Sequence, residues 1–311
     1  MVQGNWRSGA PRWAIDYLGA MVGRMRGWRI SPAHFVERFG LIIIIALGES
    51  IVAIGLGAAG LPLDTGVIAA ALLGMTVIAC LWWSYFDWVI FVAQAALAEA
   101  TGASRAALAR DAYSYLHLPM VAGIVLFAFG LETTLHDVND PLRIVPALGL
   151  CAGIALYLLA HVALRLRIGA GFGRGRSVAT VLLLGLVPVA RVVPALTALG
   201  LVAAVCAALI GYEAIRYREG RAWIRSRRGA FTMEEVARAP GRSRGRDGVP
   251  RASMASVMVW LVFVVALPIG VWTDTRWLAQ VGFLGVIALP VAGVIVQVAS
   301  SKSRHSGDPG R

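Results

Sequence analysis

The chain has 311 residues, of which 58% are hydrophobic and 15% charged, and its formal net charge is +12. A soluble domain is about 45–50% apolar, so this composition argues against a soluble enzyme and favours a polytopic membrane protein. The positive charge does not indicate nucleic-acid binding, because the basic residues lie beside apolar runs, where the positive-inside rule expects them.

Eight apolar runs predict membrane-spanning helices in an all-α bundle, since each is about long enough to cross a bilayer. The predicted spans are residues 39–59, 67–90, 113–132, 143–164, 177–190, 193–213, 254–272 and 277–298. The expected organisation is a cytoplasmic segment 1–38, a six-helix membrane domain 39–215, a linker 216–253, and a C-terminal transmembrane hairpin with a basic tail, 254–311. The first twelve residues lack the apolar stretch of a cleavable signal peptide.

The basic residues of the predicted loops predict the orientation of the chain. With the N-terminus inside, 26 of the 29 basic residues fall in inner segments, and only Arg143, Arg191 and Arg276 fall in outer turns. Such a bias is typical of cytoplasmic loops, so we expect both termini inside and an even number of spans.

The linker 216–253 carries eleven arginines and little apolar periodicity. Two interpretations stay open, attraction to anionic lipid headgroups and a solvated loop that only sets topology. The lipid bilayer is the expected partner, nucleic acid is not, and a homo-oligomer remains open.

Glu49 lies near the middle of the first predicted span, where a charged side chain is costly and usually faces protein or a cavity. Ala46, Ser50, Ala53 and Gly57 form a small-residue stripe on the same helix. Because Glu49 borders this stripe, we expect it to face protein, either as an ion-handling carboxyl or as a hydrogen-bonded clamp between helices.

Asp87 lies in a Trp-rich segment, 81–88, near the inner end of the second span. It belongs to a largely polar helical stripe that includes Ser84 and Gln94. The residue is therefore a second candidate, for ion handling or for structural pairing.

His117 and His161 are predicted at a similar depth near the inner face, in the third and fourth spans. Pro119 cannot donate a backbone hydrogen bond, which predicts a local kink beside His117. Each histidine alone is typical of a packed core residue, but their shared depth makes the group a candidate site.

Three further polar residues, His34, Glu37 and Arg38, open the first span on the same side and complete the predicted inner polar layer.

His34 and Glu37 have a common helical spacing, and the chain has no HExxH motif and no CxxC pair, so no metal site is predicted. No phosphate loop or dinucleotide fingerprint is present, and no cofactor is predicted. The Gly-rich segment 169–175, with Arg174 and Arg176, is interpreted as an inner turn.

Four motifs occur in a distinctive order along residues 11–228. They are His34-Phe-Val-Glu-Arg-Phe-Gly40, the Leu47-Gly-Glu-Ser50 that follows, the segment Trp82-Trp83 to Asp87, and Tyr113-Ser-Tyr-Leu-His117-Leu-Pro119 through Gly130-Leu131-Glu132. His161, further along the chain, fits the same pattern. The chain thereby resembles the bacterial low temperature requirement A (LtrA) family. The resemblance implies a multi-pass protein of the bacterial inner membrane, linked by name to growth at low temperature, and implies no established reaction.

The chain differs from the family pattern in two places. Family members usually begin with further membrane helices, whereas residues 11–22 look like the tail of a helix whose beginning is missing. The hairpin 254–298 lies beyond the usual end of the family.

Three functions stay open from the sequence. The first is proton- or small-ion-coupled transport through an inward-facing polar cavity, lined by Glu49, Asp87, His117 and His161. The second is a non-catalytic membrane scaffold or stress-adaptation protein, whose buried polar groups only lock helices together. The third is an enzyme acting on lipids with the inner polar layer as acid and base; on balance the chain is expected not to be an enzyme.

Overall fold

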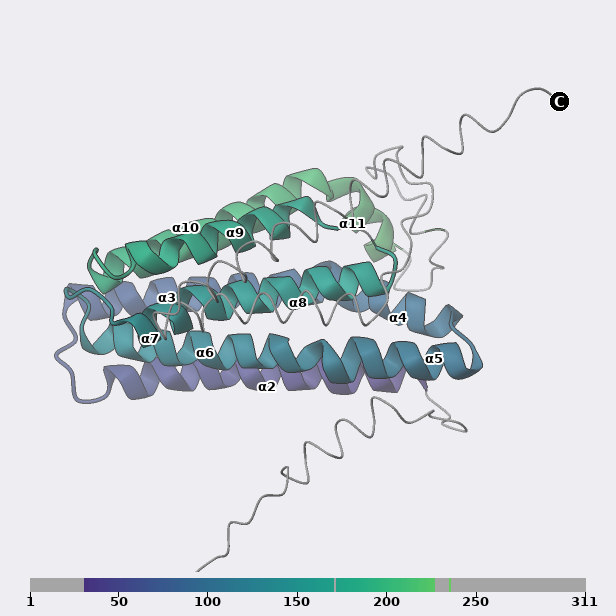
Figure 1. Cartoon of the computed structure of the whole chain (residues 1–311), viewed down its shortest axis with the longest axis horizontal. Helices are drawn as coiled ribbons and strands as arrows, with labels where there is room; N and C mark the ends of the chain where they lie inside the picture. The colour runs from purple at the N-terminus through teal and green to yellow at the C-terminus, as the bar shows by residue number, and fades with distance from the viewer. Residues whose placement is uncertain (1–30, 171, 227–234, 236–311) are drawn as a thin grey trace, which may run out of the picture.

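The computed structural model describes residues 31–170, 172–226 and 235, and its elements there are all helical (Figure 1). The α-helices are α2 (Pro32–Ala58), α3 (Thr65–Ser84), α4 (Ile90–Glu99), α5 (Gly102–Ala109), α6 (His117–His136), α7 (Ile144–Ala147), α8 (Gly153–Arg167), α9 (Arg174–Val189), α10 (Ala195–Arg216) and α11 (Arg218–Ser226). Three π-helical turns join some of them: η1 (Tyr85–Val89), η2 (Arg110–Tyr115) and η3 (Leu148–Ala152).

Each π-helical turn lies inside one long helix rather than between two. The long helices run over Thr65–Glu99, Gly102–His136 and Ile144–Arg167, with η1, η2 and η3 in their interiors. In η2 the Leu116 N–H bonds the Asp111 carbonyl, five residues back, at 3.2 Å. This widened turn occurs close to Pro119, where the sequence predicts a kink. Such π-bulges within helices frequently occur at functional sites.

The helices form an antiparallel bundle with two distinct ends. Figure 1 shows α9 and α10 along one side, α2 and α6 along the other, and α3 and α8 between them, in agreement with the contacts among these helices. We call the end with residues 100–101, 168–170 and 172–173 the arginine-rich end. The opposite end has the turns 59–64, 137–143 and 190–194.

Local sequence signals fix the turns at the opposite end. Gly60 has a φ of 77°, a conformation that glycine adopts without steric cost, and it follows the C-terminal end of α2. The Asp64 carboxylate then accepts a hydrogen bond from the Val67 N–H at 2.9 Å and caps α3. A backbone hydrogen bond from Ala195 N to Asp140 O, 2.9 Å long, joins the other two turns.

Helices α6 and α8 approach each other closely because glycines face glycines. A Cβ atom placed on Gly123 would lie 2.5 Å from the Gly153 carbonyl oxygen, and one on Gly153 would lie 2.8 Å from the Gly123 oxygen. Close approach of small residues is a usual basis of helix association in membranes, where lipid replaces water around the bundle. The contact holds the helix of His117 against the helix of His161.

The prediction of an all-α membrane bundle is confirmed at the level of fold. Five described helices are long and apolar enough to cross a membrane, and they coincide with five predicted spans. They are Pro32–Ala58, Thr65–Glu99, Gly102–His136, Ile144–Arg167 and Ala195–Arg216. The predicted span 177–190, the fifth in chain order, corresponds to the shorter α9, which has 16 residues. The predicted spans 254–272 and 277–298 lie outside the described residues, as do most of the segments 1–38 and 216–253.

Candidate functional site

Two predicted site residues, His117 and His161, meet at one aromatic side chain. The ring centroid of Tyr85 lies 5.7 Å from that of His117 and 5.8 Å from that of His161, nearly perpendicular to both rings. All three side chains are buried. The two histidines, which the sequence predicts at a similar depth, therefore form one cluster with Tyr85, and the three side chains come from three different long helices.

Both nitrogens of His117 are engaged. Its Nδ1 lies 2.9 Å from the Ala112 carbonyl oxygen, which can only accept, so Nδ1 carries the proton in the neutral ring. The Tyr85 hydroxyl then donates to Nε2 across 2.8 Å. The ring also stacks on Tyr113, with 5.2 Å between centroids and 17° between planes. His117 is thus fixed in position and tautomer.

His161 has one engaged nitrogen and one without a partner. Its Nδ1 donates to the Tyr157 carbonyl oxygen at 2.9 Å. Its Nε2 is buried and has no hydrogen-bond partner among the described residues. In the neutral ring this atom is an acceptor, so His161 presents a buried lone pair that can take up a proton.

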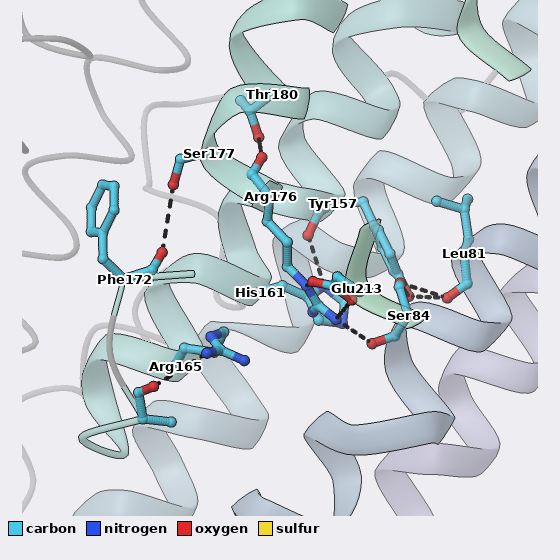
Figure 2. A network of polar contacts seen from close by, with 11 residues as sticks. Leu81, Ser84, Tyr157, His161, Arg165, Phe172, Arg176, Ser177, Thr180 and Glu213 are labelled. Atoms are coloured by element: carbon cyan, nitrogen blue, oxygen red, sulfur yellow. Dashed lines mark hydrogen bonds and ion pairs between the residues drawn. The ribbon is translucent and has the colours of Figure 1, made fainter. Parts of the chain in front are cut away.

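A fully buried ion pair lies beside His161 (Figure 2). Arg176 Nε donates to Glu213 Oε1 at 2.8 Å, and Nη2 donates to Glu213 Oε2 at 3.0 Å. Nη2 also donates to the Ser84 carbonyl oxygen at 2.8 Å. The guanidinium therefore ties α9 to α10 and to α3. Its Nη1 has no partner among the described residues.

Tyr157 connects the ion pair to the histidine cluster. Its hydroxyl donates to the Leu81 carbonyl oxygen at 2.8 Å and lies 3.4 Å from the Ser84 hydroxyl. Its ring packs against His161, with 4.4 Å between centroids. We define the polar layer as Ser84, Tyr85, Tyr113, His117, Tyr157, His161, Arg176 and Glu213.

A second ion cluster lies nearer the arginine-rich end. The buried Asp111 carboxylate accepts from Arg167 Nε and Nη2 through Oδ2, at 3.0 and 2.9 Å. Arg110 Nη2 lies 2.9 Å from the other oxygen, Oδ1. Asp111 belongs to η2, so this cluster anchors the widened turn to the end of α8.

The remaining predicted site residues lie apart from the polar layer or at its edge. Asp87 is half-buried in η1, two residues beyond Tyr85. His34, Glu37 and Arg38 are exposed at the start of α2, where His34 Nδ1 lies 3.7 Å from Glu37 Oε2. Such an exposed pair contributes little to stability.

Glu49 departs from its expected orientation, because it is exposed on the described bundle. The small-residue stripe is buried as predicted, with Ala46, Ser50, Ala53 and Gly57 all inside. Successive helical residues turn by 100°, so Glu49 falls beyond the edge of that stripe. It lies instead on the face that carries Ile45 and Val52, which are exposed as well.

Sequence reasoning missed Arg176 and Glu213. The interpretation of 169–175 as a turn is corrected at its end, since α9 begins at Arg174. Arg176 lies in its first helical turn and is 1% exposed. One signal was available: Arg176 lies 14 residues before the short turn 190–194 and Glu213 lies 19 residues after it, so an antiparallel hairpin brings both toward the same end of the bundle. Among the described residues, no group of three or more His, Cys, Asp or Glu could hold a metal ion.

These observations define an all-helical integral membrane protein with a buried, charged polar layer. Residues 4–211 match the family described as bacterial low temperature requirement A protein (LtrA), and the chain belongs to this family. Comparisons with curated proteins and with solved structures each gave no significant match.

Proposed function

We propose that the protein is a proton- or small-ion-coupled transporter of the bacterial inner membrane. The observation that carries the proposal is the buried cluster in which Tyr85 separates two histidines and His161 Nε2 has no hydrogen-bond partner among the described residues. Buried ionisable residues are costly in a membrane and mark ion or proton pathways in many proteins. A histidine is the side chain whose protonation changes near physiological pH.

The proposed orientation puts the polar layer nearer the cytoplasm. Nine arginines from Arg38 to Arg218 lie at or near the arginine-rich end of the described bundle, whereas Arg143 and Arg191 lie at the other. By the positive-inside rule the arginine-rich end is cytoplasmic, with the N- and C-termini on that side and about eight spans in all. Protons or ions reaching the layer from the cytoplasm would meet the Asp111 cluster before His161.

Proton flux into liposomes tests the proposal. The purified full chain is reconstituted with a trapped pH dye, and dye signal is followed under an imposed proton gradient with varied cations and anions. We expect flux that His161→Gln abolishes and that His136→Gln, an exposed histidine at the opposite end, leaves unchanged. Absence of flux from correctly folded wild-type protein would refute transport.

A scaffold function is the second candidate, and the Arg176–Glu213 pair favours it. The guanidinium joins three helices through hydrogen bonds of 2.8 to 3.0 Å, as a purely structural clamp would. The scaffold hypothesis expects substitutions of the buried polar residues to lower the thermal stability of the protein. It also expects that no ion raises that stability. Stabilisation by any transported ion would distinguish the two functions.

A further inference from the structure

Three buried polar atoms of the polar layer have no hydrogen-bond partner among the described residues. They are Tyr113 Oη, His161 Nε2 and Arg176 Nη1. Buried polar atoms are normally satisfied, so such atoms call for a ligand or water. Arg176 Nη1 is a donor in every protonation state, and His161 Nε2 becomes a donor when the ring is protonated. These two side chains are neighbours (Figure 2).

The unpartnered atom of Arg176 favours a negatively charged ligand. The titratable and charged groups near His161 are Tyr85 of η1, His117 of α6, Tyr157 and Arg165 of its own helix, Arg176 of α9 and, across Arg176, Glu213 of α10. Arg176 is already paired with Glu213, and the half-buried Asp87 is next along η1. The remaining Arg176 atom, Nη1, is a hydrogen-bond donor, from which an anion can accept and a metal cation cannot.

His161 is the group in this neighbourhood that can bring a proton with the anion. Both nitrogens of His117 are already hydrogen-bonded, to Ala112 and Tyr85. Arg176 keeps its charge at any working pH, and tyrosines remain neutral. Protonation of His161 would turn its unpartnered acceptor into a second donor near the Arg176 guanidinium. An unpaired charge is costly in a low-dielectric interior, so proton and anion should bind together.

We propose that the polar layer binds a small inorganic anion, of the size of chloride or nitrate, between Arg176 Nη1 and the protonated Nε2 of His161. The proposal rests on the proposed transport function and names its cargo as one anion together with one proton. No covalent step is involved, because the proton moves onto His161 as the anion arrives and leaves with it.

Binding is tested on the purified full chain in detergent. Thermal unfolding and titration calorimetry are measured with sodium nitrate or sodium chloride, and with sodium gluconate at equal ionic strength as the bulky control anion. If one proton accompanies each anion, the apparent Kd should rise about tenfold for each pH unit above the pKa of the free site. His161→Gln should remove this pH dependence, and His136→Gln should retain it.

A measurement on the wild-type chain guards against variants that fail to fold. Nitrate added to weakly buffered protein should cause uptake of one proton per anion bound, which a pH electrode records directly. Binding without proton uptake, or equal binding by His161→Gln, would overturn the proposal. Absence of binding by both chloride and nitrate to folded protein would overturn it as well.

Liposome flux separates failure of this inference from failure of the proposed function. Proton flux that requires nitrate or chloride and ceases in gluconate supports the anion assignment. Proton flux that persists in gluconate and follows the cation gradient leaves transport standing and refutes the anion. No proton flux under any ion gradient refutes transport itself.

Discussion

Arg176 and Glu213, 37 residues apart in sequence, form a bidentate ion pair in the bundle interior, with N–O distances of 2.8 and 3.0 Å. Both side chains are almost completely shielded, at 1% and 8% exposure. Because the third hydrogen bond of the guanidinium goes to the Ser84 carbonyl, the pair holds the end of α3 as well as α9 and α10. The pair therefore joins three helices within the polar layer.

Breaking this pair from one side should be more damaging than replacing both partners. Arg176→Met leaves the Glu213 carboxylate buried without its partner and should cost about 3–5 kcal/mol. Adding Glu213→Leu should recover part of that loss, because no uncompensated charge remains. Thermal unfolding in detergent of both single variants and the double variant gives the coupling energy. Independent, additive losses would contradict the pairing.

Removing the charge of Asp111 should loosen η2. Asp111→Asn weakens the hydrogen bonds from Arg167 and the contact with Arg110, and should cost about 1–3 kcal/mol. The loss should concentrate at the arginine-rich end, where hydrogen exchange of residues 110–116 should accelerate. Asp137→Asn, at the turn after α6, is a matched control and should leave this exchange unchanged. Equal hydrogen-exchange protection of residues 110–116 in Asp111→Asn and Asp137→Asn would show that Asp111 does not anchor η2.

A methyl group at Gly123 should separate α6 from α8. The added Cβ would meet the Gly153 carbonyl oxygen at 2.5 Å, so Gly123→Ala should cost about 1–3 kcal/mol through overpacking. Gly55→Ala in α2 is the control, since nothing lies within 4 Å of its Cβ position, and it should be neutral or stabilising. Comparing the melting temperatures of the two variants in the same detergent tests this difference in stability. A harmless Gly123→Ala would mean that the helices pack less closely.

Neutralising Glu49 should not weaken the described bundle. The side chain is exposed on an apolar face of α2 and has no place in the polar layer, so Glu49→Gln should keep or raise the melting temperature. Glu213→Gln is the contrasting variant and should lower it. A marked loss in Glu49→Gln would show that another segment or a second copy covers this carboxyl.

Removing the Tyr85 hydroxyl should release His117. Tyr85→Phe keeps the ring between the two histidines but deletes the 2.8 Å hydrogen bond to Nε2, at a cost of about 1 kcal/mol. If the pair takes part in proton movement, liposome proton flux should fall far more than stability does. Tyr212→Phe, half exposed on α10, is the control for loss of a tyrosine hydroxyl. Unchanged flux in Tyr85→Phe would exclude this hydroxyl from the pathway.

The sequence by itself determined where the helices of the membrane domain lie. Apolar length, and glycine or proline at positions such as Gly60 and Pro194, are local properties, so six predicted spans correspond to described helices. It also predicted a similar depth for His117 and His161, because depth is predicted by counting residues along antiparallel spans. The family likewise could be recognised from short motifs in order.

Tertiary structure alone decided which side chains meet. The partner of Arg176 is set by how α9 packs on α10, and the contact of both histidines with Tyr85 depends on the π-helical turns η1 and η2. Neither relationship is local, so no sequence window contains it. Glu49 shows the same limit. Its position along the span could be counted from the sequence, but each helical residue turns by 100°, so the packing of α2 decides which way the side chain faces.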